Sequence, residues 1–389
     1  MDRDEAADEA ARRLAELRGA VRLIGEGVAA ATDVVQDMQK AITATPLDLL
    51  AAVHPVGETA RKVHEGVRDG VYAAVRGASR LLFRAADVAL ERGSWRPQRG
   101  LSGPVVGAVR GVIGDHLAGG DSPLGCAMQL RVDGQRLTLT REAVAAALPA
   151  AGPRVAVFVH GLACDESCWL RGAGGERPSV DYAGQLAGRH GYTALQVRYN
   201  SGLRVADNGA ALAALLAELA AVYPGGIERL VVIGHSMGGL VARSAAHHGQ
   251  VGGAAWVSAL RDVVCLGSPQ LGAPLEQLGA AAVAVLAAIG VTAPLARVFD
   301  ARSAGIKDMH TGAIVDDGEV LRPPRTRYHS IAGSLGGPGH PLGWVLGDGM
   351  VRVSSAHGGE DGVRIPGLHH MDLLNHPAVF AEIEAALVD

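Results

Sequence analysis

Apolar residues near the start of the chain recur at the spacing of packed helices. From Leu14 to Ile42 they are separated alternately by three and four residues, which places them along one face of a helix. Pro46 and Pro55 interrupt this pattern, and a second helical stretch follows. The sequence therefore predicts a helical hairpin region over residues 1–98, whose faces could pack on each other, on the rest of the chain or on a second copy in a homo-oligomer.

After residue 126 the pattern changes to short apolar runs that alternate with helical stretches. A hairpin comes first, since residues 128–132 and 136–140 flank the turn-forming pair Asp133-Gly134. Strands are predicted next at residues 155–159, 194–199, 230–233, 263–266, 328–332 and 363–365, and helices at residues 206–222, 238–248 and 377–387. This alternation predicts an α/β domain over residues 99–389, in which helices cover both faces of a mostly parallel sheet.

The strand predicted at residues 230–233 runs directly into Gly234-His235-Ser236-Met237-Gly238, and a predicted helix follows at once. A G-x-S-x-G sequence between a strand and a helix is typical of a tight turn that lifts a nucleophilic serine above a sheet. Glycines at the two flanking positions remove side chains that would collide in the turn. We therefore predict that Ser236 is a nucleophile, rather than an ordinary serine in a glycine-rich turn.

A second apolar strand, residues 155–159, ends in His160-Gly161-Leu162. A loop in this position can supply a backbone donor to the negative charge that develops on a carbonyl oxygen. We predict that the two donors are the backbone N–H groups of Leu162 and Met237. His160 is expected to hold the loop by hydrogen bonds rather than to take part in chemistry.

A serine nucleophile of this kind needs an acid and a base that follow it in the order Ser, Asp or Glu, His. Asp348 lies between two glycines in a loop after the strand at residues 328–332 and is the predicted acid. Three other aspartates compete with it: Asp316, Asp317 and Asp361. The first two precede the strand, and the third lies in a turn that reads as solvated.

The predicted base is His370, which comes 22 residues after Asp348 in the sequence Leu368-His369-His370-Met371-Asp372. Its rivals are His369, which would line the pocket, and His376, which precedes the proline that begins the last predicted helix. The base must accept a proton from Ser236 on one ring nitrogen and be oriented by Asp348 through the other.

Residues 126–389 resemble the α/β-hydrolase superfamily, and within it the bacterial triacylglycerol lipases and the GPI inositol-deacylase-like serine hydrolases. The motifs that carry the resemblance are His160-Gly161-Leu162, Gly234-His235-Ser236-Met237-Gly238, Gly267-Ser268-Pro269-Gln270-Leu271-Gly272, Asp348-Gly349-Met350-Val351 and His370-Met371-Asp372. The resemblance implies an α/β-hydrolase fold and assigns nucleophile, acid and base to Ser236, Asp348 and His370.

Two positions depart from the lipase pattern. Gln270 stands where lipases of that branch often have histidine, outside the three catalytic positions. Some of these lipases bind calcium through two aspartates. Asp372 matches one of them, but Tyr328 occupies the other position. We therefore expect no metal, and the predicted chemistry requires no cofactor.

About fifty residues lie between Gly272, where the third of these motifs ends, and the strand predicted to begin at Tyr328. Residues 278–296 within this stretch carry no charge. By the same resemblance, residues 273–326 form an inserted lid, with an apolar helix over the site. The alternative is a helix packed permanently on the core.

Composition limits the range of functions. Hydrophobic residues make up 48% of the 389, which excludes a disordered chain, and the net charge of −4 gives no basic excess for binding nucleic acid. The acidic first ten residues contain no apolar segment of a secretory signal, so a cytoplasmic location is expected and the four cysteines are expected to be thiols.

Residues 61–99 contrast with this acidic balance, since they hold nine basic and four acidic residues. Arg76, Arg80 and Arg84 recur every four residues and form a stripe on one helix face. A basic amphipathic helix can lie on an anionic membrane. The simpler interpretation is a solvated charged face over a helix–helix contact.

Together these features predict a serine hydrolase that cleaves small-molecule or lipid carboxylic esters. The same three residues would also serve an acyltransferase, in which an alcohol or thiol replaces water. A third hypothesis is a helical interaction or membrane-surface module attached to an inactive hydrolase scaffold.

Overall fold

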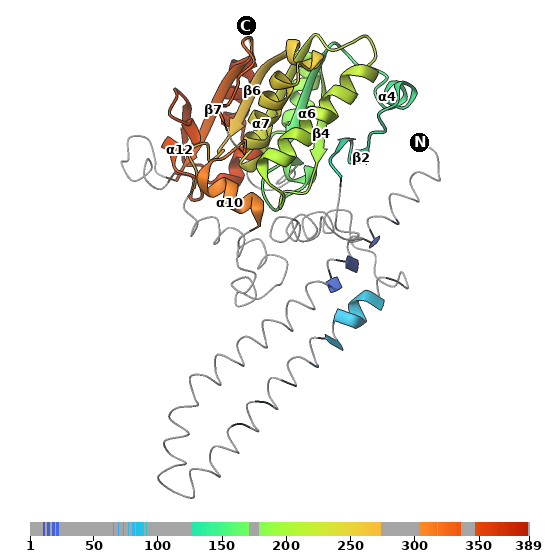
Figure 1. The fold of residues 1–389 in the computed structure, drawn as a ribbon, viewed down its shortest axis with the longest axis vertical. Coiled ribbons are helices and arrows are strands. Elements are labelled where there is room, and N and C mark those ends of the chain that lie inside the picture. Colours follow the sequence, from blue (N-terminus) through green and yellow to red (C-terminus); the bar gives the residue numbers. More distant parts are fainter. Residues whose placement is uncertain are drawn as a thin grey trace, which may run out of the picture. The chain divides into compact units, whose positions relative to one another are not determined.

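The computed structural model describes residues 127–170, 179–273, 303–316, 318–335 and 347–387, together with scattered residues between 11 and 91. The chain divides into two compact units, and every strand of the sheet belongs to the second (Figure 1). The uncharged run at residues 278–296, in the predicted lid, lies outside the described residues.

A single sheet organises the second unit, with its strands in the order β2-β1-β4-β3-β5-β6-β7-β8. The strands are β1 (Gln129–Val132), β2 (Gln135–Arg136), β3 (Arg154–Val159), β4 (Tyr192–Arg198), β5 (Arg229–His235), β6 (Leu260–Leu266), β7 (Arg327–Ser334) and β8 (Val363–Pro366). Strands β3 to β8 pair in parallel, and β1 is antiparallel to both of its neighbours. The predicted mostly parallel α/β sheet is thus confirmed.

The opening hairpin is shorter than predicted. Its turn has positive φ angles of 48° at Asp133 and 73° at Gly134, as a two-residue hairpin loop requires. The second strand, however, stops at Arg136, where the sequence predicted it to continue to residue 140. Thr140 instead begins a helix, because its hydroxyl accepts a hydrogen bond from the Ala143 N–H at 3.2 Å.

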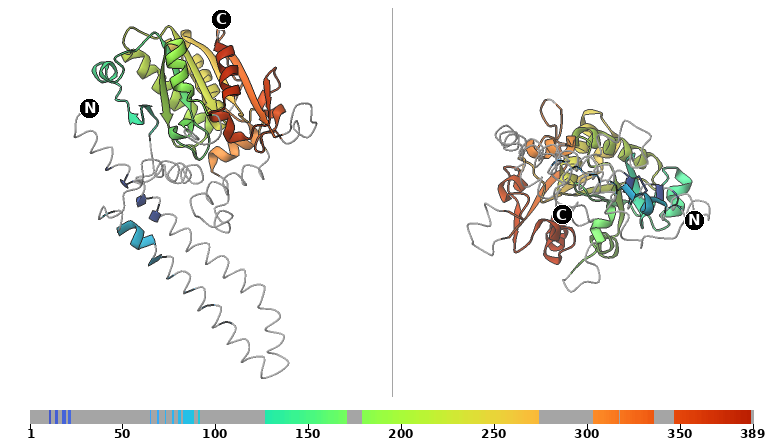
Figure 2. Two further views of the ribbon diagram at one scale, coloured as in Figure 1. Left: turned by 180° about the vertical axis from the view of Figure 1, so that it is seen from behind. Right: turned by 90° about the horizontal axis from the view of Figure 1, so that it is seen from below.

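Helices cover both faces of the sheet (Figures 1 and 2). They are α4 (Arg141–Ala147), α5 (Tyr182–His190), α6 (Val205–Val222), α7 (Met237–Val251), α10 (Ala304–Thr311), α12 (Val353–His357) and α13 (Pro377–Leu387), with 3₁₀ turns η1 (Glu166–Leu170), η2 (Ala255–Ser258) and η3 (His370–Leu374). Side chains of β3 alternate between two hydrophobic cores: Val157 faces the core that contains α6 and α7, and Phe158 faces the core that contains α5 and α13.

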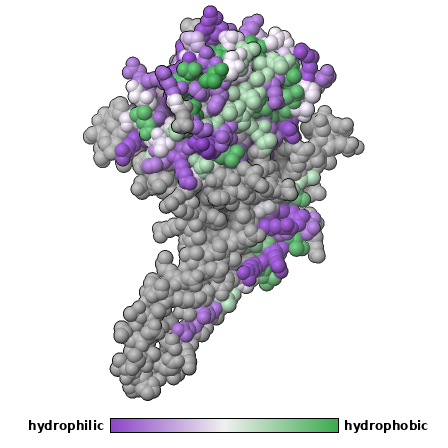
Figure 3. All heavy atoms as spheres, in the orientation of Figure 1, coloured by the Kyte–Doolittle hydropathy of each residue, from purple (hydrophilic) through white to green (hydrophobic). Residues whose placement is uncertain are grey.

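Within the part of the chain that the structure describes, α6 is the one helix long and apolar enough to cross a membrane. It is nevertheless packed on the sheet through buried Leu212, Leu216 and Leu219. Its solvent side is mainly alanine, which accounts for pale green over this face in Figure 3. The length and hydropathy of α6 are therefore explained by its place in a core.

The described part of the predicted 273–326 insertion includes α10, whose Ile306 and Met309 are buried in the α6–α7 core.

The described residues between 11 and 22 and between 65 and 91 are helical. Arg18 lies 2.7 Å from Asp87, which also accepts a bond from Arg22 at 2.7 Å. These ion pairs join the two helical stretches. The membrane contact through residues 61–99 and the homo-oligomer through the N-terminal helices are not tested by these contacts and stay predictions.

Candidate active site

The turn that carries Ser236 is as tight as the sequence predicts. Strand β5 ends at His235, helix α7 begins at Met237, and Ser236 between them has φ 53° and ψ −124°. A residue other than glycine rarely adopts a positive φ, so the surrounding structure must hold this conformation. A Cβ atom at Gly234 would lie 2.4 Å from Gly238 backbone atoms, and one at Gly238 would lie 2.2 Å from the Val159 oxygen. Both flanking positions therefore require glycine.

The loop that follows β3, residues 160–165, lies against this turn and is called here the β3 loop. A Cβ atom at Gly161 would lie 3.0 Å from the Ser236 Cβ. This contact follows from strand register, because Val159 pairs with Gly234 in the neighbouring strand. Among the described residues, neither the Leu162 N–H nor the Met237 N–H donates a hydrogen bond to another residue. The two predicted oxyanion donors are therefore on adjacent segments, and the described part of the chain does not use them.

The structure joins Asp348 to His370. The His370 Nδ1 lies 2.7 Å from the Asp348 Oδ2, and the His370 backbone N–H donates to the Asp348 carbonyl oxygen at 3.0 Å. The other carboxylate oxygen, Oδ1, accepts the Val351 and Met350 backbone N–H groups at 2.8 and 3.0 Å. Gly267 permits this approach, since a Cβ there would lie 3.0 Å from the Asp348 Oδ2.

Asp348 stays ionised although it is 2% exposed. Burial acts to raise the pKa of its carboxyl group, but the charge and hydrogen bond of His370 and the two backbone donors outweigh burial, so the pKa is below its ordinary value. A fixed carboxylate of this kind holds the imidazole with Nδ1 protonated and leaves Nε2 to accept a proton.

The His370 ring lies beside the residue that precedes Ser236. Its Nε2 is buried and has no hydrogen-bond partner in the described part of the chain. The ring centroid is 4.6 Å from that of His235, which directly precedes Ser236, and the His235 Nε2 lies 3.0 Å from the His370 carbonyl oxygen. Burial, followed by the charge of His370, lowers the pKa of His235 to about 3. His235 is therefore a neutral neighbour that ties the turn to the segment of His370.

The rival residues lie elsewhere. The side chain of His369 is 47% exposed and pairs with Asp372 at 3.1 Å, where both cap η3. His376 accepts a hydrogen bond from the Ala378 N–H at the start of α13. Asp316 pairs with an exposed arginine, Asp361 is exposed, and Asp317 lies outside the described residues.

Of the aspartates and histidines considered from sequence, the structure thus joins Asp348 to His370 and places the His370 ring beside that of His235, the residue before Ser236. No three His, Cys, Asp or Glu side chains of the described residues are placed to hold a metal ion.

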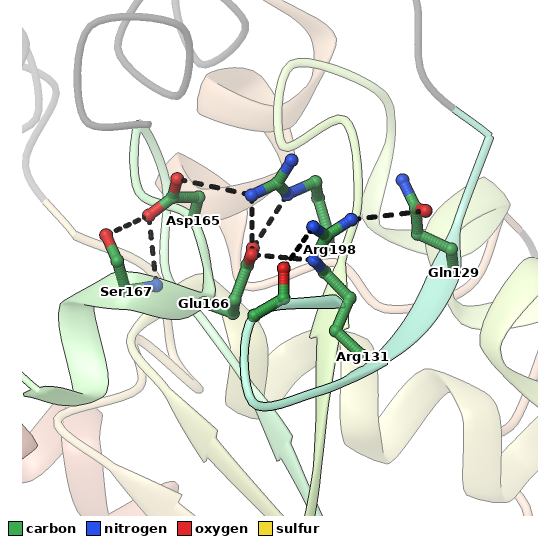
Figure 4. Close-up of polar contacts among 7 residues, drawn as sticks. Gln129, Arg131, Asp165, Glu166, Ser167 and Arg198 are labelled. Atoms are coloured by element: carbon green, nitrogen blue, oxygen red, sulfur yellow. Dashed lines mark hydrogen bonds and ion pairs between the residues drawn. The ribbon is translucent and has the colours of Figure 1, made fainter. Parts of the chain in front are cut away.

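Sequence reasoning missed a buried ion network beside the β3 loop. Glu166 lies between two arginines, with its carboxylate 2.5 Å from Arg198 and 2.8 Å from Arg131 (Figure 4). The sequence does contain a signal for it, because Asp165 and Glu166 stand at the end of the loop that carries the predicted oxyanion donor Leu162. If two adjacent acidic side chains are buried, each needs a partner of opposite charge or a hydrogen-bond donor.

Known proteins support the same fold. The family model described as a PGAP1-like alpha/beta domain matches residues 198–283, which include β5, the serine turn, α7 and β6. No curated protein matches the chain in sequence.

Several solved structures are also similar. The mature lipase BlEst2 of Bacillus licheniformis is 25% identical over 61% of this chain and 93% of its own, with a TM-score of 0.44. A lipase-esterase related protein of Clostridium acetobutylicum is 15% identical over 61% of this chain and 96% of its own, with a TM-score of 0.37. The RedJ thioesterase of the prodiginine pathway in Streptomyces coelicolor is 19% identical over 61% and 92%, with a TM-score of 0.37.

The fold assignment rests on three findings. The sheet is mostly parallel and has helices on both faces, a strained serine turn joins β5 to α7, and the family-model match includes that turn. The described part of residues 127–387 has an α/β-hydrolase fold, as the sequence motifs predicted, and residues 198–283 match the PGAP1-like alpha/beta domain.

Proposed function

We propose that this protein is a serine hydrolase that cleaves carboxylic esters through Ser236, His370 and Asp348. The observation that carries the proposal is the buried Asp348–His370 pair, 2.7 Å apart. The Nε2 of His370 has no partner among the described residues, and the ring lies 4.6 Å from that of His235, which directly precedes the strained Ser236. A buried nitrogen without a partner is costly to a protein. A role as proton acceptor from the serine hydroxyl accounts for it.

The proposed first half-reaction forms an acyl-enzyme. The Ser236 Oγ attacks the acyl carbon while the His370 Nε2 accepts the hydroxyl proton, and Asp348 stabilises the imidazolium that results. The carbonyl oxygen becomes an oxyanion that accepts hydrogen bonds from the Leu162 and Met237 N–H groups. When the tetrahedral intermediate collapses, His370 gives the proton to the leaving alcohol.

The second half-reaction uses water in place of the serine hydroxyl. His370 accepts a proton from water, the hydroxide attacks the acyl carbon, and the Ser236 oxygen leaves with the proton that His370 returns. The products are a carboxylic acid and an alcohol, and the chemistry needs no cofactor. The same acyl-enzyme would react with an alcohol or thiol in an acyltransferase, so product analysis separates the two reactions.

Exposed leucines support an apolar acyl group. Leu170, Leu271 and Leu335 are 54%, 60% and 51% exposed, and each lies on a segment that follows the carboxyl end of β3, β6 or β7. Since the carboxyl ends of parallel strands share one edge of the sheet, the segments that carry these leucines leave the sheet at the same edge as Ser236. Apolar surface there suits the hydrocarbon part of an ester.

A lid within residues 273–326, inferred from the uncharged run at residues 278–296, and a membrane contact through residues 61–99 are further parts of this proposal. If residues 278–296 belong to a lid, polar substitutions in them should reduce hydrolysis of long-chain esters far more than hydrolysis of short-chain esters. Equal losses on both would show a core segment, because a core defect destabilises the enzyme whatever the substrate. Co-sedimentation with anionic vesicles at low and high salt tests the membrane contact.

The central test is covalent labelling. The wild-type protein should react with a fluorophosphonate probe and hydrolyse a chain-length series of nitrophenyl esters, whereas Ser236→Ala should fold normally and do neither. Thr140→Ser, a substitution at a helix cap in the same unit, is a control that should label like the wild type. Labelling and ester hydrolysis by Ser236→Ala would show that the nucleophile is wrongly assigned.

A further inference from the structure

Two consecutive residues at the end of strand β4, Arg198 and Tyr199, make hydrogen bonds to the two ends of the β3 loop. Arg198, the last residue of β4, makes two hydrogen bonds to Glu166, directly after the loop, at 2.7 and 2.5 Å. The next residue, Tyr199, donates its hydroxyl to the His160 carbonyl oxygen at 2.8 Å, and the two rings stack with centroids 4.3 Å apart. Both ends of the loop are thus held from one strand.

The middle of the loop is held from the same segment. Ser201 accepts the Ala163 N–H at 3.1 Å. Ala163 has a φ of 58°, a conformation that an alanine does not adopt without support. Leu162, whose N–H is a proposed oxyanion donor, directly precedes it. The direction of that N–H is therefore set by a strained backbone that three contacts from β4 and the residues after it hold in place.

Figure 4 shows the ion network that anchors Arg198, and its charged side chains are almost completely buried. The exposed fractions of Arg131, Glu166 and Arg198 are 1%, 7% and 8%. Arg198 also lies 3.8 Å from Asp165, whose other oxygen accepts hydrogen bonds from the Ser167 side chain and N–H. Burial acts to raise the pKa of Glu166, but the hydrogen bonds and charge of Arg198 and the charge of Arg131 outweigh it, so the pKa is below its ordinary value.

Stability alone does not account for such a network. A buried set of charges is often no more stable than apolar residues of the same volume, because removing the charges from water is costly. What paired charges provide is a defined geometry, and two parallel bonds from a guanidinium to a carboxylate fix direction as well as distance. The network lies where the proposed reaction needs fixed direction, at the loop that carries the Leu162 N–H.

We propose that Arg198 is a positioning residue which, through Glu166 and together with Tyr199 and Ser201, holds the β3 loop so that the Leu162 N–H points at the oxyanion. This inference rests on the proposed hydrolase function. It adds a residue from β4 that touches neither the substrate nor the three proposed catalytic side chains.

The test compares two buried arginines. Arg198→Lys keeps the positive charge but cannot make two parallel hydrogen bonds to Glu166. Arg229→Lys is the matched control, because Arg229 also pairs with a buried carboxylate, that of Asp262 at 3.0 Å, but at the opposite end of the sheet. Each full-length variant is assayed for kcat and KM on a short nitrophenyl ester and for inhibition by an alkylboronic acid, whose tetrahedral adduct with serine uses the oxyanion donors.

Since small misplacement of a reacting group or loss of one oxyanion donor costs about 10²-fold or more, Arg198→Lys should lower kcat by about 10- to 100-fold with KM within about twofold of the wild type. Its inhibition by the boronic acid should weaken in the same proportion. Arg229→Lys should leave kcat and boronic acid inhibition within about twofold of the wild type, even if its melting temperature falls.

A second variant covers the case in which Arg198→Lys does not fold. Tyr199→Phe keeps the ring that stacks on His160 and removes only the hydroxyl bond, so it should show a smaller loss of kcat than Arg198→Lys, with boronic acid inhibition weakened in proportion to that smaller loss. Unchanged kcat in the folded variants, or losses equal to those of Arg229→Lys, would overturn the positioning role. Absence of Ser236-dependent turnover in the wild-type protein would instead overturn the proposed function itself.

Discussion

Two aspartate–histidine pairs, each with a buried aspartate, lie at opposite ends of the parallel strands. At the carboxyl edge Asp348 bonds to His370 at 2.7 Å, and at the amino edge Asp262, the third residue of β6, bonds to His329 at 2.9 Å. Both aspartates are buried, and both have a pKa below the ordinary value for a carboxyl group. By composition and distance the two pairs are almost equivalent.

Their surroundings differ. Asp262 also bonds to Arg229 at 3.0 Å and Arg327 at 2.9 Å, so two arginines share its carboxylate with His329. His329 is 24% exposed at the start of β7, whereas His370 is buried, has an Nε2 without a partner among the described residues, and lies beside His235 of the serine turn. A buried Asp–His pair is therefore not a site by itself. Whether such a pair can transfer a proton depends on which end of the strands it lies at and on which group faces the second ring nitrogen of the histidine.

The largest expected difference between the two pairs is in turnover. Asp348→Asn should lower kcat by about 10⁴-fold, because the amide favours the wrong tautomer of His370. Asp262→Asn should leave the kcat of the folded protein within about twofold, since it lies at the other edge. Steady-state kinetics on a nitrophenyl ester measures both. Equal losses would mean that Asp262 is coupled to the chemistry and would break the contrast.

The histidines sharpen the same contrast. His370→Ala should also lower kcat by about 10⁴-fold, since the proton acceptor is lost. His369→Ala and His329→Ala should have far smaller effects, because the first side chain is 47% exposed and the second faces the amino edge. An essential His369 beside a dispensable His370 would reverse the assignment of the base.

The free energy of unfolding should show the opposite order, with a larger loss for Asp262→Asn than for Asp348→Asn. Asp262→Asn removes the charge that neutralises Arg229 and Arg327, and breaking a buried ion pair costs about 3–5 kcal/mol when both partners are fully buried. Since Arg327 is 45% exposed and screened by water, we expect a loss of about 2–3 kcal/mol in the free energy of unfolding. Urea unfolding followed by circular dichroism tests this. A loss below that of Asp348→Asn would contradict the view that the amino-edge cluster is structural.

The smallest expected effect is on the response to acid. Burial raises the pKa of Asp262, but hydrogen bonds from His329 and Arg327 and the charge of Arg327 lower it more, so the net shift is downward. A carboxyl group with a lowered pKa contributes stability above its unfolded pKa of about 4, and this contribution is lost as pH falls through the folded pKa. The difference in unfolding free energy between the wild type and Asp262→Asn should therefore shrink below about pH 4.

This acid response is measured by urea unfolding at pH values from neutral to strongly acidic. His329→Ala serves as the comparison variant, because it removes one of the groups that lower the pKa of Asp262 but keeps the carboxylate. It should show a smaller acid-dependent loss than the wild type. A difference between the wild type and Asp262→Asn that stays constant with pH would show that the carboxylate adds no ionisation-linked stability.

Local sequence determined much of the fold. Apolar runs of strand length predicted the parallel strands, because a strand buried on both faces must be apolar at consecutive positions. Gly234 and Gly238 around Ser236 predicted the turn, because the steric demand acts within five residues. Helix α4 was missed for a local reason as well: Thr140 continues the alternation of a strand, yet its hydroxyl caps a helix instead.

Pairing between distant charged residues was decided by the tertiary structure. The sequence could rank Asp348 and His370 by chain order, but it gave no sign that Asp262 and His329 form a second, similar pair. It also left Glu166 and Arg198, 32 residues apart, unconnected. Such contacts depend on which strands are neighbours and on their register, and both are settled by the packing of the whole sheet. Local patterns thus determined where nucleophilic chemistry could occur, and strand order determined which charges surround it, because burial makes each charge take the partner that the fold places beside it.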